Sequence, residues 1–159
     1  MGFISGDAAA THAAGQALGA LVEPGDVLSL CGDLGAGKTA LVKGIADGMG
    51  VTGRVTSPTF NILMVHAGPT ITLNHFDLYR LEHPDELVDI DLWGVLESGG
   101  VSVIEWGDRF DDALPPDHLS VAISILDADT REFDLRASGP RSEELARQWT
   151  RAVTGGERS

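Results

Sequence analysis

The spacing of apolar residues along the first fifty positions changes from helical to strand-like and back to helical. Residues 7–22 are rich in alanine, follow the candidate capping residues Ser5 and Asp7, and end before a Pro-Gly pair, so they predict a helix. The apolar run 26–31 is typical of a buried strand, and residues 39–46 again carry apolar side chains at helical spacing. This order predicts a helix, a strand, a glycine-rich turn and a second helix.

The rest of the chain predicts further strands and short helices separated by turn residues. Two strand-like runs flank Ala67-Gly68-Pro69, a turn signal that favours a hairpin. The predicted strands lie at about residues 60–66, 70–76, 101–105, 119–126 and 132–136, and the predicted helices at about 83–88, 90–97 and 142–153. Helices alternating with strands indicate a three-layer α/β fold, in which a mixed, mostly parallel sheet is flanked by helices.

Residues 32–39, with the sequence GDLGAGKT, fill every fixed position of the phosphate-binding motif G-x-x-x-x-G-K-[ST]. The predicted strand before this motif and the helix after it are the context that a P-loop NTPase fold requires, which disfavours a chance glycine turn. Lys38 should reach the β- and γ-phosphates of ATP or ADP, and the hydroxyl of Thr39 should bind Mg²⁺. The residues expected to contact the nucleotide here are Asp33, Leu34, Gly35, Ala36, Gly37, Lys38, Thr39 and Ala40.

Two acidic residues follow predicted strands and are candidates for ordering the metal ion. Asp77 ends the second strand of the hairpin, and Glu105 ends the apolar strand 101–105. Open α/β sheets bind their ligands at the carboxyl ends of strands, so both acids are expected at the nucleotide edge. The apolar run before Glu105 favours it as the direct Mg²⁺ ligand, with Asp77 acting through water. A solvated acid at a strand end is the alternative for either residue.

Hydroxyl side chains at Ser57 and Thr59 flank Pro58, where P-loop proteins often carry a loop that senses the γ-phosphate. These hydroxyls, together with Lys38 and Asp77, are the candidate catalytic groups, and they could touch Mg²⁺ or orient the attacking water. An ordinary Ser-Pro turn is the alternative.

Three further side chains have more than one interpretation. His75 lies near Asp77, but a histidine beside a strand is more often structural than a catalytic base. Trp106 could stack on a ligand or fill a core or an interface. Arg131 could pack over an adenine or be a solvated turn residue.

Composition limits the partners of the chain. Its 159 residues suit one domain, expected at 1–153 with a disordered tail at 154–159. The formal charge is −13 with only two lysines, Lys38 and Lys43, so the surface is not suited to holding nucleic acid by itself. The single cysteine, Cys31, and the lack of a long apolar run or a signal-peptide pattern favour the cytoplasm.

Four motifs follow one another along the chain, namely GDLGAGKT at 32–39, SPTF at 57–60, HFDLYRL at 75–81 and IEW at 104–106. Their order and spacing resemble the bacterial TsaE (YjeE) family of ATPases in tRNA threonylcarbamoyladenosine biosynthesis. The phosphate loop alone fits many NTPases, whereas the block His-Phe-Asp-Leu-Tyr-Arg is highly specific. The resemblance covers roughly residues 3–138.

The resemblance implies a cytoplasmic ATPase that is weak alone and works with the TsaB and TsaD proteins. That set installs threonylcarbamoyl on N6 of adenosine 37, with the transfer performed by TsaD and the tRNA held by the partners. By position, Thr39 and Glu105 match the Mg²⁺ ligands of the family, and Asp77 matches its essential acid. Arg131 falls where the family places an arginine that contacts the nucleotide. The first-helix region near Ala8 to Thr11 is expected beside the adenine.

Two alternatives share the phosphate loop with an ATPase. A non-catalytic switch would control its partner through the bound nucleotide alone, without hydrolysis. A small-molecule kinase usually has an arginine-bearing lid and an acceptor pocket, and no lid-like insertion is visible in this sequence.

Overall fold

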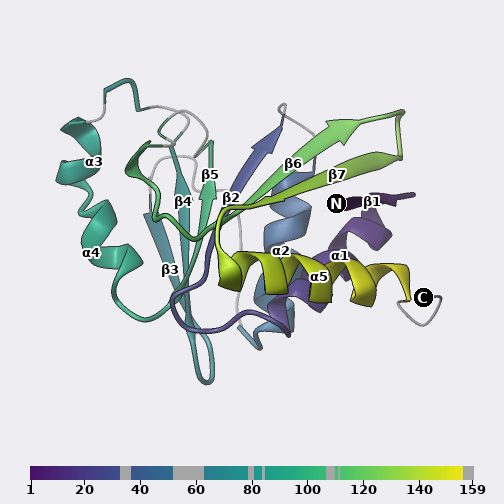
Figure 1. Cartoon of the computed structure of the whole chain (residues 1–159), viewed down its shortest axis with the longest axis horizontal. Helices are drawn as coiled ribbons and strands as arrows, with labels where there is room; N and C mark the ends of the chain where they lie inside the picture. The colour runs from purple at the N-terminus through teal and green to yellow at the C-terminus, as the bar shows by residue number, and fades with distance from the viewer. Residues whose placement is uncertain are drawn as a thin grey trace.

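A mixed seven-stranded sheet forms the middle of the molecule (Figure 1). The computed structural model describes residues 1–32, 37–51, 63–78, 81–83, 85–106, 110 and 112–155. The strands are β1 (Gly2–Ser5), β2 (Val27–Gly32), β3 (Leu63–Ala67), β4 (Thr72–Asp77), β5 (Val101–Glu105), β6 (Leu119–Ile125) and β7 (Arg131–Ala137). They lie in the order β1-β7-β6-β2-β5-β4-β3.

The central strands of this sheet run parallel. β2 pairs in parallel with β5 and with β6, and β5 pairs in parallel with β4. β3 is antiparallel to β4, and β7 is antiparallel to both β6 and β1, so β1 runs in the same direction as β6. The predicted mixed, mostly parallel α/β sheet is therefore confirmed.

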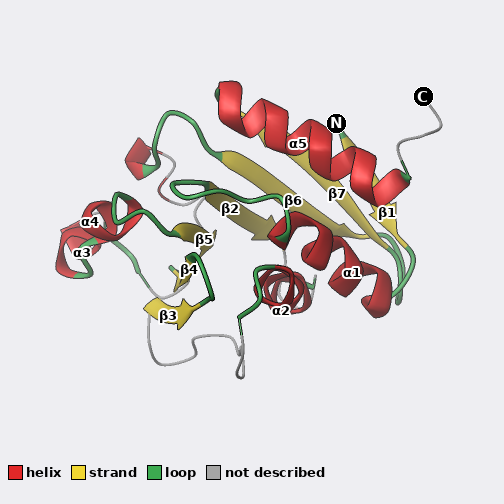
Figure 2. Ribbon diagram, turned by 90° about the horizontal axis from the view of Figure 1, so that it is seen from below, coloured by secondary structure: helices red, strands yellow, loops and turns green. Residues whose placement is uncertain are grey.

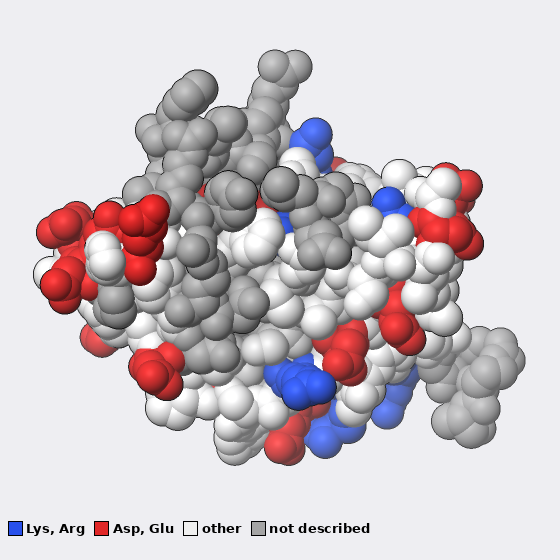
Figure 3. Space-filling view, turned by 90° about the horizontal axis from the view of Figure 1, so that it is seen from above, with Lys and Arg blue, Asp and Glu red and all other residues white. Residues whose placement is uncertain are grey.

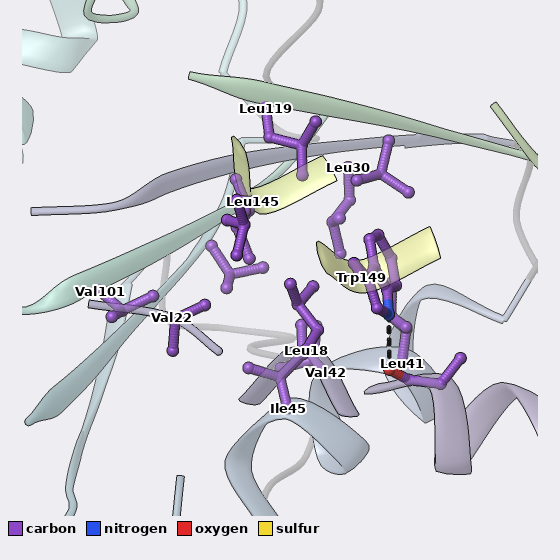
Figure 4. Close-up of a cluster of buried hydrophobic side chains, with 14 of the residues drawn as sticks. Leu18, Val22, Leu30, Leu41, Val42, Ile45, Val101, Leu119, Leu145 and Trp149 are labelled. Carbon is purple, nitrogen blue, oxygen red and sulfur yellow. Dashed lines mark hydrogen bonds between the residues drawn. The ribbon is translucent and has the colours of Figure 1, made fainter. Parts of the chain in front are cut away.

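Helices cover the two faces of the sheet and make the three layers. They are α1 (Ala8–Gly19), α2 (Lys38–Gly48), α3 (Asp85–Asp89), α4 (Leu92–Leu96) and α5 (Pro140–Thr154). Successive strand residues point to opposite faces, so Val103 packs in the core with α1, α2 and α5, while Ile104 packs in the core with α3 and α4. The indole of Trp149 joins α5 to α1 by donating from Nε1 to the carbonyl of Ala14 at 2.8 Å (Figure 4).

α1 and α2 lie side by side with their backbones in contact (Figure 2). A Cβ placed on Gly15 would lie 2.4 Å from the carbonyl oxygen of Leu41, and one placed on Gly44 would lie 2.2 Å from that of His12. Only glycine permits such an approach, because any larger side chain would push the helices apart. This contact fixes α1 against the helix that follows the phosphate loop.

The ends of the elements differ from the predictions in a few places. The side chain of Asp7 accepts a hydrogen bond from the Ala10 amide at 2.7 Å, so Asp7 is the cap of α1. Ser5 belongs instead to β1, a strand that the apolar pattern did not predict because only four residues form it. α1 ends at Gly19, three residues before the predicted end, and α4 is shorter than predicted at both ends.

The last helix begins two residues earlier than predicted, because Asp117 caps it from outside. The carboxylate of Asp117 accepts from the amides of Arg141 and Ser142, both at 2.9 Å. Burial opposes ionisation of this carboxylate, but the hydrogen bonds from Ser142 and Arg141 prevail and lower the pKa of Asp117. Thr154 is the last residue of α5, and residues 156–159 of the predicted tail lie outside the described part.

Within the residues that the structure describes, no helix has both the length and the apolar character needed to cross a membrane.

Candidate functional site

The strand and helix that should flank a phosphate loop are in place. β2 ends at Gly32 and α2 begins at Lys38, with Gly37 as its cap at φ +107°. This backbone conformation lies in the left-handed region, which favours glycine. The amino end of α2, which carries a partial positive charge, follows directly after Gly37. The loop residues Asp33, Leu34, Gly35 and Ala36 lie outside the described part.

Lys38 is buried at the start of α2, and its ammonium group contacts the end of β2 and an aromatic ring. Nζ donates to the carbonyl oxygen of Gly32 at 2.6 Å and lies 3.7 Å from the centroid of the Trp106 ring. A carbonyl dipole and the negative face of an aromatic ring both stabilise the positive charge. Trp106 has φ +65°, a left-handed conformation that is uncommon for a residue other than glycine and is enriched at functional sites.

Asp77 and Glu105 end neighbouring parallel strands at the same level. They are register partners in β4 and β5, and Glu105 is also the register partner of Leu30 in β2. The amide of Leu78 donates to the carbonyl of Glu105 at 3.1 Å, and that of Trp106 donates to the carbonyl of Leu30 at 3.0 Å. The ends of β2, β4 and β5 are thus tied together at one edge of the sheet, as the sequence predicted for the two acids.

The carboxylate of Glu105 is only 4% exposed and is hydrogen-bonded to His75, with 2.5 Å between Oε2 and Nε2. A buried carboxylate requires a hydrogen-bond donor or a cation as a partner. Its oxygen atoms and the hydroxyl of Thr39, in the first turn of α2, are the kinds of donor that a hard cation such as Mg²⁺ prefers. Among the described residues, no group of three or more His, Cys, Asp or Glu is arranged to hold a metal by itself.

Thr11 lies close to Gly37, the residue that caps α2, and its predicted place beside the adenine stays a prediction. It is buried in α1, and its Cγ2 atom would lie 3.7 Å from a Cβ placed on Gly37. Its hydroxyl shares a hydrogen bond with that of Ser5 at 2.7 Å. Ser5 is in turn the register partner of Arg131, the first residue of β7.

The guanidinium group of Arg131 contacts its own turn. Nη1 donates to the carbonyl oxygens of Asp127 at 2.8 Å and Thr130 at 3.1 Å. These bonds hold the side chain along the β6–β7 turn. Its predicted contact with the adenine stays a prediction.

The remaining predicted site residues divide into two groups. Thr39 and Ala40 are half-buried in the first turn of α2, next to Lys38. Ser57 and Thr59, together with Tyr79 and Arg80 of the HFDLYRL motif, lie outside the described residues.

Two contacts in this site were not predicted from the sequence. One joins His75 to Glu105, and the other joins Lys38 to Trp106. The sequence does indicate that His75 and Asp77 lie on the same face of β4, because residues two apart on a strand point the same way. The contact with Glu105 also depends on β4 and β5 being neighbours, and the sequence does not state the order of strands.

Acidic side chains gather at the end of the molecule that carries α3 and α4 (Figure 3). Exposed acids from this end are Glu82, Asp85, Asp89, Asp91 and Glu97. The described part of the face in Figure 3 shows only scattered Lys and Arg side chains. An acidic surface repels the phosphate backbone of a nucleic acid.

Comparison with known proteins gives one consistent family. The model of the family "Threonylcarbamoyl adenosine biosynthesis protein TsaE" matches residues 5–133. The TsaE protein of Bacillus subtilis is 40% identical over 141 residues, covering 89% of this chain and 88% of that protein. TsaE of Streptomyces coelicolor is 44% identical over 121 residues, covering 74% of this chain and 81% of the relative. The crystal structure of YdiB from Bacillus subtilis superposes with a TM-score of 0.79 at 33% identity, covering 96% of this chain and 95% of that one.

Proposed function

Because this chain belongs to the TsaE family of tRNA threonylcarbamoyladenosine biosynthesis, we propose that it is a Mg²⁺-dependent ATPase that acts with TsaB and TsaD. The product of that set is N6-threonylcarbamoyladenosine at position 37 of tRNA, formed in the cytoplasm. The observation that carries the proposal is the convergence of Lys38, at the start of α2, with the strand-end acids Asp77 and Glu105 at one edge of the sheet.

The phosphates of ATP would bind where the amino end of α2 meets the end of β2. Backbone amides of residues 33–37 and the helix terminus supply hydrogen-bond donors and partial positive charge. Lys38 would exchange its bond to the Gly32 carbonyl for bonds to the β- and γ-phosphates. Because its ammonium group is already buried at this edge, it loses little further hydration when a phosphate arrives. Thr11 and Arg131 would contact the adenosine part of the nucleotide.

Thr39 and Glu105 would hold the cation. When bound, Mg²⁺ neutralises charge that develops on the γ-phosphate. Asp77 is the register partner of Glu105 and is less buried, so it can reach a water molecule at the same edge. With Ser57 and Thr59 it would orient that water for attack on phosphorus, and Lys38 would stabilise the transferring group.

The partners have two roles in this proposal. Hydrolysis by the isolated chain would be slow if a partner must complete the arrangement around the γ-phosphate, because one missing charge-stabilising group costs about 10³-fold or more in phosphoryl transfer. The acidic surface of the chain is unsuited to phosphate backbones. TsaB and TsaD would therefore hold the tRNA, and TsaD would perform the transfer.

Reconstitution of the modification tests this function. TsaB, TsaD, unmodified tRNA and a threonylcarbamoyl donor are incubated with ATP and Mg²⁺, with or without this chain, and modified adenosine is measured by mass spectrometry over many turnovers. We expect sustained formation only with the wild-type chain and ATP. Equal yields with and without the chain, or with a non-hydrolysable ATP analogue in place of ATP, would contradict the proposal.

A further inference from the structure

His75 and Glu105 are held next to each other by the pairing of β4 with β5. His75 is the register partner of Val103, and Glu105 is the register partner of Asp77. Residues two apart on a strand point to the same face, so His75 lies one step behind Glu105 on the face that carries Asp77. The 2.5 Å separation of Nε2 and Oε2 follows from this placement.

The environment of the pair makes this hydrogen bond strong. His75 has no exposed surface, and the side chain of Glu105 is 4% exposed. A hydrogen bond to an ionised group is roughly twice as strong as one between neutral groups, and little water competes with it here. The bond engages one carboxylate oxygen of Glu105, and a carboxylate has a second oxygen to offer a cation.

Packing alone does not explain a histidine at this position. The neighbouring side chains on the same face of β4 and β5, Leu73, Val101 and Val103, are apolar and fully buried. A leucine would fill the space without polar atoms, whereas the Nδ1 atom of His75 is buried with no hydrogen-bond partner among the described residues. A buried polar atom without a hydrogen-bond partner is destabilising. The hydrogen bond between Nε2 of His75 and the carboxylate of Glu105 is the contact that offsets this cost.

We propose that His75 is a positioning residue that orients the Glu105 carboxylate to bind Mg²⁺ with the nucleotide. This inference rests on the proposed function, because it assigns a role toward the cation of that same site. Hydrogen bonds to a metal ligand fix its orientation, and their removal typically lowers metal affinity about 10–100-fold. His75 therefore acts through Glu105 and does not itself touch the reacting phosphate.

The test compares the wild type with His75→Leu, His75→Gln and the control His66→Gln. His66 lies in β3 of the same hairpin, opposite Leu73, and takes no part in the Glu105 contact. Burial lowers the pKa of His66, and the neighbouring His75 lowers it further, so both effects disfavour the charged form of His66. The readouts are Mn²⁺ binding in the presence of ADP, followed by electron paramagnetic resonance, ADP affinity in EDTA, and melting temperature.

We expect His75→Leu to weaken Mn²⁺ binding by roughly 10–100-fold while ADP affinity in EDTA changes less than about twofold. His75→Gln can still donate to the carboxylate and should recover part of the loss, and His66→Gln should match the wild type. Unchanged Mn²⁺ affinity in folded His75→Leu would overturn the proposal. So would a parallel loss of Mn²⁺ affinity, metal-free ADP affinity and melting temperature, which is the result of a merely structural role.

A double-mutant cycle keeps the proposal falsifiable if His75→Leu does not fold. In a Glu105→Ala background, adding His75→Gln should leave Mn²⁺ affinity unchanged, because the side chain through which His75 acts is absent. Additive losses would overturn the positioning role. If the wild type itself shows no metal-dependent ADP binding, the proposed function fails instead, so the two failures are distinguishable.

Discussion

Replacing Lys38 by alanine is expected to weaken ATP binding by roughly 100-fold or more. The ammonium group is buried at the start of α2, and its contacts with the Gly32 carbonyl and the Trp106 ring place it at the edge where the phosphates should bind. A hydrogen bond between charged groups contributes about 1.5–3 kcal/mol, and Lys38 would make such bonds to two phosphates. Titration calorimetry with ATP and Mg²⁺ measures the loss.

Lys43→Ala is the matched control for this experiment. Lys43 is the other lysine of the chain and lies in the same helix, but it is exposed. Its replacement should leave ATP affinity within about twofold of the wild type, since an exposed charge contributes little. If Lys38→Ala bound ATP as tightly as Lys43→Ala does, the phosphate-loop assignment would be wrong.

Replacing Glu105 by alanine or glutamine is expected to remove most of the gain in nucleotide affinity that Mg²⁺ provides. Glu105 is the buried carboxylate at the edge shared by β2, β4 and β5, and a carboxylate is the strongest Mg²⁺ ligand available there. Glutamine preserves the shape and can still accept the hydrogen bond from His75, so it isolates the loss of charge. We expect a fall of about tenfold or more in the ratio of ATP affinities with Mg²⁺ and with EDTA.

The affinity for ATP in EDTA should change little in the Glu105 variants, because the loop and Lys38 are intact. Glu97→Gln, an exposed acid after α4, serves as the control. A Glu105→Gln protein whose ATP affinity depends on Mg²⁺ as strongly as that of the wild type would contradict the assignment of Glu105 as the metal ligand, and would turn attention to Asp77.

The sequence predicted the parts of the fold that depend on local signals. The glycine motif at 32–39 predicted a strand before it and a helix after it, and β2 and α2 are there. The apolar run 101–105 coincides with β5. Both faces of this strand are covered, so a continuous buried run, and not an alternation of apolar and polar residues, is the pattern that predicts it. β1 was missed, because a four-residue strand leaves too short a pattern and is stabilised by its pairing with β7.

The contacts within the site were harder to predict, because they depend on which strands are neighbours. The rule that ligands bind at the carboxyl ends of strands placed Asp77 and Glu105 at one edge. That these two acids are register partners, with His75 next to Glu105, depends on the pairing of β4 with β5, which the sequence did not predict. The contact of Lys38 with Trp106 further required the left-handed backbone at Trp106, which no residue preference indicates.

The proposed function requires that this chain hydrolyse ATP and do so faster with its partners. The rate of phosphate release by the purified chain, alone and with TsaB and TsaD, tests this directly, with Lys38→Ala measured in parallel. We expect slow turnover alone, a rise of roughly tenfold or more with the pair, and no turnover by Lys38→Ala under either condition. ATP that is bound but never hydrolysed, even with both partners present, would contradict an ATPase and identify a nucleotide-controlled switch.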